Sequence, residues 1–205
     1  MHFRLRILWL FAIALLAIGS ASFIRDRQER HALRFAQLAE QSQSILQNQI
    51  QELNVVMNQL EPALAKTWMT ERILASKLNS AKIPTGSMYY LFDEGILRFW
   101  SDNKTHIDST IVNYLKSGEI NFISNGWYYV LLRKYNTRVL VGIIPIQQQY
   151  ILQNKYLVNS FNTELSLPID TKLLIKPATG TWAITDNQNH YLFSLLFSPD
   201  LNTIP

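Results

Sequence analysis

The sequence lacks cysteine and has only seven glycines and seven prolines in 205 residues. The absence of cysteine excludes disulfides, thiolate metal sites and a cysteine nucleophile. No two glycines form a G-x-G pair, so the chain holds no glycine-rich kinase lid over a nucleotide. The G-x-S-x-G, H-E-x-x-H and Walker patterns are also missing, and Ser, His and Asp have no triad-like spacing. The sequence therefore shows no catalytic motif, and we expect no cofactor and no bound metal.

The chain also lacks a basic surface of the kind that binds nucleic acid. It carries 19 Lys and Arg against 15 Asp and Glu, a formal net charge of +4. Five of the basic residues flank one apolar stretch near the N-terminus: Arg4, Arg6, Arg25, Arg27 and Arg30. The rest of the chain is close to neutral and has no basic stripe interleaved with aromatics. The isoelectric point of the chain is high mainly because of the arginines that flank the apolar stretch. It therefore does not indicate a nucleic-acid partner.

One long apolar run is present, from Ile7 to Ile24, and it contains no charged residue. As a helix rising about 1.5 Å per residue it would cover roughly 27 Å, close to the hydrocarbon core of a bilayer. We therefore predict a transmembrane signal anchor at residues 1–24, with the N-terminus inside and most of the chain extracytoplasmic, in the inner membrane. The alternative is a secretory signal cleaved after Ala21.

A long helix is expected to follow the apolar run. Residues 26–78 contain no glycine and are rich in helix-forming residues, so residues 25–83 read as a helical stalk, kinked or broken near Pro62. An a/d heptad seam runs along it through Leu46, Ile50, Leu53, Met57, Leu60 and Leu64. Two readings stay open: the seam packs on the protein's own sheet, or it forms a parallel homodimer.

Residues 84–165 are predicted to be a mixed module. Aromatic-rich runs at 88–92 and 96–100 surround an acidic turn with Gly95, and runs at 127–133 and 138–144 surround another turn, so both pairs read as hairpins. Between them we expect a short helix capped by Asp108 and a strand at 119–124. Pro145 is expected to end the apolar strand before it, and residues 147–165 to form a helix. Residues 166–205 are expected to add short strands, and no second membrane span follows. The fold class predicted from these patterns is α+β.

The order of these elements resembles the PAS-like or Cache-like sensor domains of bacterial receptors. The segments Gly126–Val130, Arg138–Ile146, Tyr150 and Asn154–Phe161 are similar to the N-terminal extracytoplasmic region of sensor histidine kinases from Bacteroidetes-type bacteria. The resemblance covers most of residues 1–165. It implies a PAS/Cache-like antiparallel sheet with flanking helices, which belongs to the sensing part of a two-component receptor. The phosphoacceptor helix and ATP-binding domain of such receptors do not occur in this sequence.

Amino-acid-binding Cache domains place an arginine two positions before a Trp-Tyr pair like Trp127-Tyr128, but this sequence has Asn125 there. The bidentate carboxylate clamp is therefore missing, and that ligand is not carried over.

Candidate ligand-binding residues are Trp100, Trp127, Tyr129 and Arg138, with Tyr128 beside them. Each aromatic residue has the competing explanation of packing within a sheet. Asp102, His106 and Asp108 lie close together in the sequence and form a weak candidate metal site, for which a solvated loop is the ordinary explanation.

The leading functional hypothesis is a signal-sensing region that relays the binding of a small molecule or protein through the long helix to the membrane. A proline placed at Gln49 should then uncouple binding from signalling. The alternative is an anchored accessory or structural protein that acts through its helical interface. A third hypothesis, a secreted enzyme, would need a convergent polar cluster that the sequence does not show.

Overall fold

A computed structural model describes residues 2–65, 71–80, 83–150, 152–155 and 157–198; most side chains before Arg25 are not among the described ones. Two compact units are present, residues 1–38 and residues 39–205. The predicted helical residues 66–70, including Trp68, and the tail 199–205 lie outside the described residues.

The first element is the helix α1, His2–Leu64. In the part of the chain that the structure describes, no helix has an apolar run long enough to cross a bilayer. The predicted transmembrane anchor at residues 1–24, and with it the predicted single-span location in the inner membrane, is therefore wrong. Ile7–Ile24 is not a separate apolar segment: it is part of one helix that continues through the charged residues after Ile24 to Leu64.

Pro62 lies inside α1, two residues before its end. α1 continues past Glu61 to Leu64, so the break predicted near Glu61 does not occur at that residue. The second described helix, α2, is Glu71–Ser80. Proline has no N–H to bond to the carbonyl four residues earlier, so it weakens the helix close to the point where α1 ends.

The larger sheet is antiparallel and has the strand order β2-β1-β5-β4-β3, with β6 beside β5. Its strands are β1 (Met88–Asp93), β2 (Ile96–Trp100), β3 (Glu119–Ile123), β4 (Gly126–Tyr135), β5 (Arg138–Gln148) and β6 (Ser160–Phe161). Both predicted hairpins, β1–β2 and β4–β5, are confirmed. The apolar strand β5 is central, as its composition predicts for a strand with neighbours on both sides.

One face of this sheet carries the short helix α3, Ser109–Tyr114. The Asp108 carboxylate accepts a hydrogen bond from the Ile111 N–H at 2.8 Å, which confirms the predicted cap. Beneath lies an apolar cluster of Met88, Tyr90, Phe92, Ile107, Val112, Ile123, Tyr128, Val130, Val141 and Ile143. The Tyr90 hydroxyl donates to the Thr105 carbonyl, and the Thr105 and Tyr128 hydroxyls share a bond of 2.8 Å. The α3 side of the sheet is therefore filled by packed side chains that hydrogen-bond to one another and to the neighbouring backbone.

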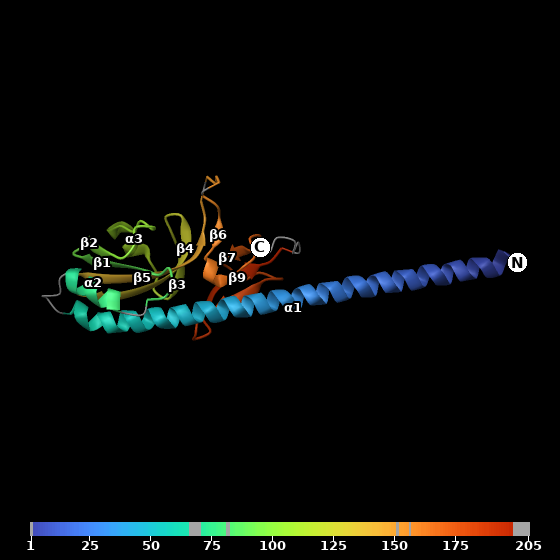
Figure 1. The fold of residues 1–205 in the computed structure, drawn as a ribbon, viewed down its shortest axis with the longest axis horizontal. Helices are drawn as coiled ribbons and strands as arrows, with labels where there is room; N and C mark the ends of the chain where they lie inside the picture. The colour runs from blue at the N-terminus through green and yellow to red at the C-terminus, as the bar shows by residue number, and fades with distance from the viewer. Residues whose placement is uncertain (1, 66–70, 81–82, 151, 156, 199–205) are drawn as a thin grey trace. The chain divides into compact units, whose positions relative to one another are not determined.

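The opposite face of the sheet is covered by the C-terminal half of α1 (Figure 1). A Cβ added to Gly142 of β5 would lie 2.9 Å from Leu53 Cδ1 and 3.0 Å from Met57 Sδ. The absence of a side chain at Gly142 thus lets the helix approach the central strand closely. All six residues of the heptad seam are buried, with at most 3% of their surface exposed. Within the chain the seam thus packs on the protein's own sheet, the first of the two readings; a homodimer stays a prediction.

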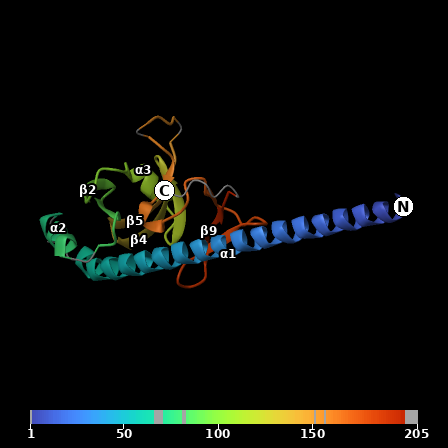
Figure 2. The ribbon, with the colours of Figure 1, turned by 45° about the vertical axis from the view of Figure 1, so that its right-hand side comes forward.

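A second sheet has the order β7-β9-β8. Its strands are β7 (Lys172–Leu174), β8 (Trp182–Thr185) and β9 (Tyr191–Leu196), and they confirm the short strands expected after residue 166. In both Figures 1 and 2 these strands lie beside α1. Both sheets of the unit therefore border the same helix.

The predicted helix at residues 147–165 is wrong. β5 continues through Pro145 to Gln148, and Gln147 and Gln148 pair with β6. Only a 3₁₀ turn, η1 (Thr163–Leu165), is helical among the described residues of this stretch. Pro145 is tolerated in the strand because the pairing with β4 shifts register beside it: Tyr128 pairs with Pro145 and Trp127 with Gln147, so Ile146 of β5 is the extra residue of a bulge.

Candidate functional site

Two glutamines of α1, one turn apart, attach the helix to the second sheet. The Gln47 side-chain amide donates to the carbonyls of Thr185 and Asp186 at 3.1 and 3.0 Å. The Gln43 side-chain oxygen accepts from the Thr185 N–H at 3.1 Å. β8 is an edge strand, whose outer backbone groups need partners. The two glutamines therefore take the place of a neighbouring strand.

The turn that follows β8 is organised by Asp186, which is 8% exposed. One carboxylate oxygen accepts the N–H groups of Gln188 and His190, both at 2.8 Å, and the other lies 3.1 Å from His190 Nδ1. Burial alone would raise the pKa of Asp186, but the N–H groups of His190 and Gln188 and the His190 side chain outweigh it and hold the pKa below its usual value. The carboxylate is therefore committed to shaping the turn. No function was assigned to Asp186 or His190 from the sequence.

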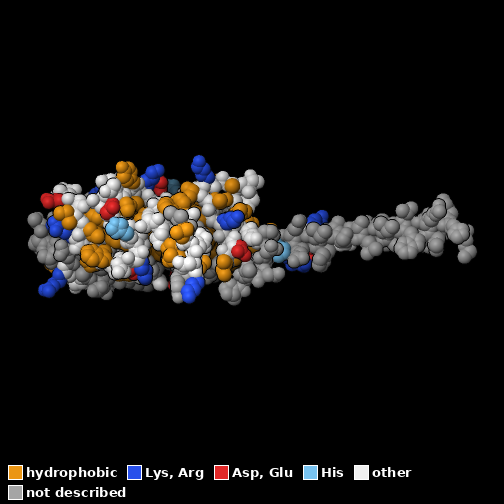
Figure 3. Space-filling model, turned by 90° about the horizontal axis from the view of Figure 1, so that it is seen from above, with side chains coloured by type: hydrophobic (Ala, Val, Ile, Leu, Met, Phe, Trp, Pro, Cys, Tyr) orange, Lys and Arg blue, Asp and Glu red, His pale blue; other side chains and the backbone are white. Residues whose placement is uncertain are grey.

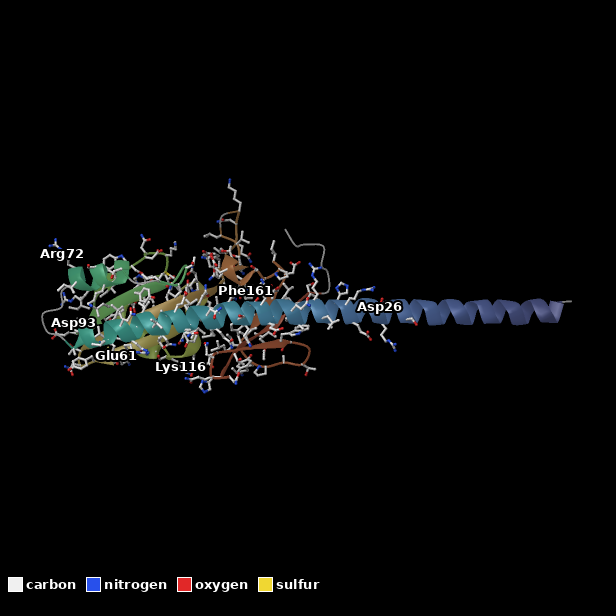
Figure 4. All side chains as sticks on the ribbon, turned by 60° about the horizontal axis from the view of Figure 1, so that its bottom comes forward. Asp26, Glu61, Arg72, Asp93, Lys116 and Phe161 are labelled. Carbon is white, nitrogen blue, oxygen red and sulfur yellow. The ribbon has the colours of Figure 1, made fainter. Side chains whose placement is uncertain are left out.

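Further along α1, on the same flank of the helix, Arg133 of β4 binds α1. Its guanidinium donates to the side-chain oxygens of Asn54, at 3.3 Å, and of Asn58, at 2.8 Å. It also pairs with Glu61 at 3.3 Å. Figure 4 looks onto the side that α1 covers, with Glu61 labelled on the helix and Lys116 labelled just before β3. Arg133 thus holds three successive turns of α1 against the sheet.

Between these two attachments lies a groove of about 960 Å³. Its walls come from α1, from the start of β3, from β4 and from the β8–β9 turn. The lining residues are Ile50, Gln51, Asn54, Val55, Asn58, Ser117, Gly118, Glu119, Ile120, Tyr129, Leu131, Ile175, Asp186, Asn187, Gln188, His190, Tyr191 and Leu192. The volume is within the range of small-molecule sites, so this groove is the candidate functional site.

Tyr129 is the residue of the groove that the sequence already singled out. It is 3% exposed and lines the groove. Its hydroxyl has no hydrogen-bond partner among the described residues, in contrast to the Tyr128 hydroxyl on the other face. Burial raises the pKa of Tyr129; the nearby Asp186 carboxylate raises it further, and Arg133 acts in the opposite direction. The phenol therefore stays protonated at neutral pH and can donate a hydrogen bond to a ligand.

The other three predicted site residues do not line the groove. Trp100 ends the edge strand β2, opposite Tyr90 on the α3 side of the sheet, and is 52% exposed. It is one of the hydrophobic side chains that reach the surface of this unit, several of which are visible in Figure 3. Trp127 packs edge-on against Phe122, with ring centroids 5.0 Å apart, and donates to Gln149. The structure therefore does not bring the predicted set into one pocket.

Arg138, the fourth predicted residue, has a structural role at the start of β5. Its guanidinium donates to the Asp93 carboxylate at 3.1 Å and to the Leu64 carbonyl at 3.3 Å. The second bond satisfies a carbonyl at the C-terminal end of α1 that the helix itself leaves without a partner. Arg138 thus fixes the end of the helix to the β1–β5 pair.

The weak candidate metal site also has local explanations. Asp102 accepts the Lys104 N–H at 2.9 Å and pairs with its ammonium at 3.0 Å, and Asp108 caps α3. His106 Nε2 lies 3.9 Å from the Asp108 carboxylate. Among the residues described here, no three His, Asp or Glu side chains gather closely enough to hold a metal ion.

Comparisons with protein-family models, with curated proteins and with solved structures found no match to this chain. The likeness to sensor histidine kinases therefore stays a prediction. The groove between α1 and the two sheets is the feature on which a function can be argued.

Proposed function

We propose that this chain is the signal-sensing region of a two-component receptor, that a small ligand binds in the groove, and that α1 carries the response. The observation that supports this is the double role of α1. The helix forms one wall of the groove through Asn54 and Asn58, and through Gln47 it holds the β8–β9 turn that forms another wall. A ligand that bridges the two walls must therefore act on the helix.

A ligand moves α1 if it binds one arrangement of the helix and the β8–β9 turn more tightly than another arrangement. The Gln47 and Gln43 bonds join side chains to backbone groups, and each contributes about 1 kcal/mol. These hydrogen bonds are weak enough to break at a small cost in free energy when a bound ligand forms new ones in their place. A shift of α1 against the turn is then passed along a hydrogen-bonded helix.

The alternative, an accessory protein acting through a helical interface, needs a free apolar seam. The predicted seam residues, Leu46 to Leu64, are buried within the chain. No observation on the described residues favours this alternative.

The experiment uses the full chain with paired spin labels. Because the sequence has no cysteine, cysteines at Glu40 and Lys176, both exposed, can be labelled without background. Amino acids, dicarboxylates and neutral saccharides are first screened for a rise in Tm. A compound that binds should change the distance between the labels, and Gln47→Ala should reduce this change without abolishing binding. A chain that no compound stabilises, or a bound compound that leaves the distance unchanged, would contradict the proposal.

A further inference from the structure

The groove contains hydrogen-bond donors whose orientation is fixed by Arg133. A guanidinium only donates, so the side-chain oxygens of Asn54 and Asn58 must face it, at 3.3 and 2.8 Å. The amide nitrogens at the other ends of these side chains have no partner among the described residues. Both asparagines line the groove. Together with the Tyr129 hydroxyl, the groove thus offers three donors that no described residue of the protein accepts from.

The charged groups of the groove, in contrast, are already committed. The Asp186 carboxylate is bound to its own turn, and Glu119 pairs with Lys116 at 3.8 Å. No Lys or Arg is among the described lining residues, and Arg133, beside the groove, is paired with Glu61. A charged ligand would lose its hydration without gaining an oppositely charged partner. The groove therefore favours an uncharged ligand.

The rest of the lining suits a ligand that both donates and accepts. Gln51, Asn187 and Gln188 contribute carboxamides, which have both kinds of group, as sugar hydroxyls do. Ile50, Val55 and Ile120 supply apolar surface between them, against which the C–H faces of a sugar ring can pack. A volume of about 960 Å³ accommodates a monosaccharide or disaccharide.

We propose that the groove binds a neutral saccharide, whose hydroxyls accept from Asn54, Asn58 and Tyr129; this inference rests on the proposed sensing function. The three donors come from two walls of the groove, α1 and β4. A sugar bound to all of them connects the helix to the sheet at a point that the protein itself leaves open.

Two substitutions remove single donors and keep the fold. Tyr129→Phe removes a hydroxyl that has no protein partner among the described residues, so folding should be unaffected. Asn58→Asp keeps an oxygen for Arg133 and replaces only the amide nitrogen. The matched control is Tyr128→Phe, one position earlier on β4, whose hydroxyl faces the other side of the sheet and is bound to Thr105. This control should lower stability and leave sugar binding unchanged.

The test is isothermal titration calorimetry of the full chain with glucose, galactose, maltose and cellobiose, and separately with glycine, glutamate and succinate. At least one sugar should bind, and Tyr129→Phe and Asn58→Asp should each weaken it about tenfold, the effect of about 1.4 kcal/mol. Binding of an amino acid or succinate but of no sugar would overturn the saccharide inference and leave the sensing function standing. Sugar binding that neither substitution weakens would refute the site. If none of the compounds binds, both the inference and the sensing function fall.

Discussion

Replacing Gly142 by alanine tests whether the close approach of α1 to the central strand holds the unit together. The new methyl group would lie 2.9 Å from Leu53 Cδ1 and 3.0 Å from Met57 Sδ. Both of these side chains are fully buried, so neither can turn into solvent to make room. The helix or the two side chains must shift.

The expected effect is the difference of two terms. Overpacking a closed interior costs about 1–3 kcal/mol. Alanine in place of glycine within a strand recovers roughly 0.5–1 kcal/mol, because the unfolded chain loses less freedom on folding. Gly142→Ala should therefore lower the free energy of unfolding by about 0–2.5 kcal/mol. Gly142→Val should lower it further.

The assay is urea unfolding of the full chain, followed by tryptophan fluorescence, with a double-mutant cycle. Leu53→Ala alone should cost about 2–5 kcal/mol, since it leaves a cavity. The methyl group of alanine at position 142 partly fills that cavity, so the double variant should be more stable than the sum predicts by at least about 0.5 kcal/mol. Gly19→Ala, with no neighbouring atom within 4 Å of the added carbon, is the control. Strict additivity, or a stabilising Gly142→Ala, would refute the close approach.

Three further predictions concern charges and buried hydroxyls. Arg133→Met should lower stability by about 1–2 kcal/mol, measured by urea unfolding, because the Asn54, Asn58 and Glu61 contacts are lost; a loss below about 0.3 kcal/mol would contradict their importance. The pKa of Asp186 is lower in the folded chain than in the unfolded chain, where it is about 3.9. The charged carboxylate therefore stabilises the fold at pH values above about 3.9, and this stabilisation is lost as the pH falls through the pKa of the folded chain. Asp186→Asn should therefore flatten the decline of Tm between about pH 5 and pH 2, and an unchanged slope would argue against it. Burial raises the pKa of Tyr89 to about 12, so its stabilising effect is complete below the unfolded pKa of about 10 and disappears as pH rises towards 12. Tyr89→Phe should reduce the loss of stability over that interval, and equal losses in both proteins would contradict the shift.

Local patterns predicted most of the sheet. The turns at Gly95 and Asn136 separate runs with strand composition, and both hairpins formed where the sequence placed them. The cap at Asp108 was also readable, because it depends on residues within one turn. These features are set by neighbours in the sequence.

The helix expected at residues 147–165 failed because distant and side-chain partners were stronger than helix propensity. The Asn159 side chain accepts the Tyr150 N–H at 2.7 Å, and the Asn154 side chain accepts the Leu157 N–H at 2.9 Å. Asn162 donates to the Pro145 carbonyl at 3.1 Å. Asparagine side chains compete with a helix for the backbone in this way, a signal that was present in the sequence.

The groove could not be predicted from local patterns. Gln47 and Asp186, which connect two of its walls, are 139 residues apart, and no pattern along the chain reports such a pairing. One pattern in the sequence did point to the groove. Amide side chains recur every four to seven residues beside the apolar seam, at Gln43, Gln47, Asn54 and Asn58. A stripe of amides on a helix flank indicates polar partners on a neighbouring element.

The contact between Leu53 and Gly142 also governs the order in which the protein can be made. About 90 residues separate the two, so at roughly 5–20 residues per second the ribosome needs about 5–18 s to supply the strand that covers the helix. During that interval the apolar stripe of α1 has no cover from its own chain. The nascent helix therefore exposes apolar surface of the kind that promotes aggregation, and the large sequence separation of its contacts makes folding slow.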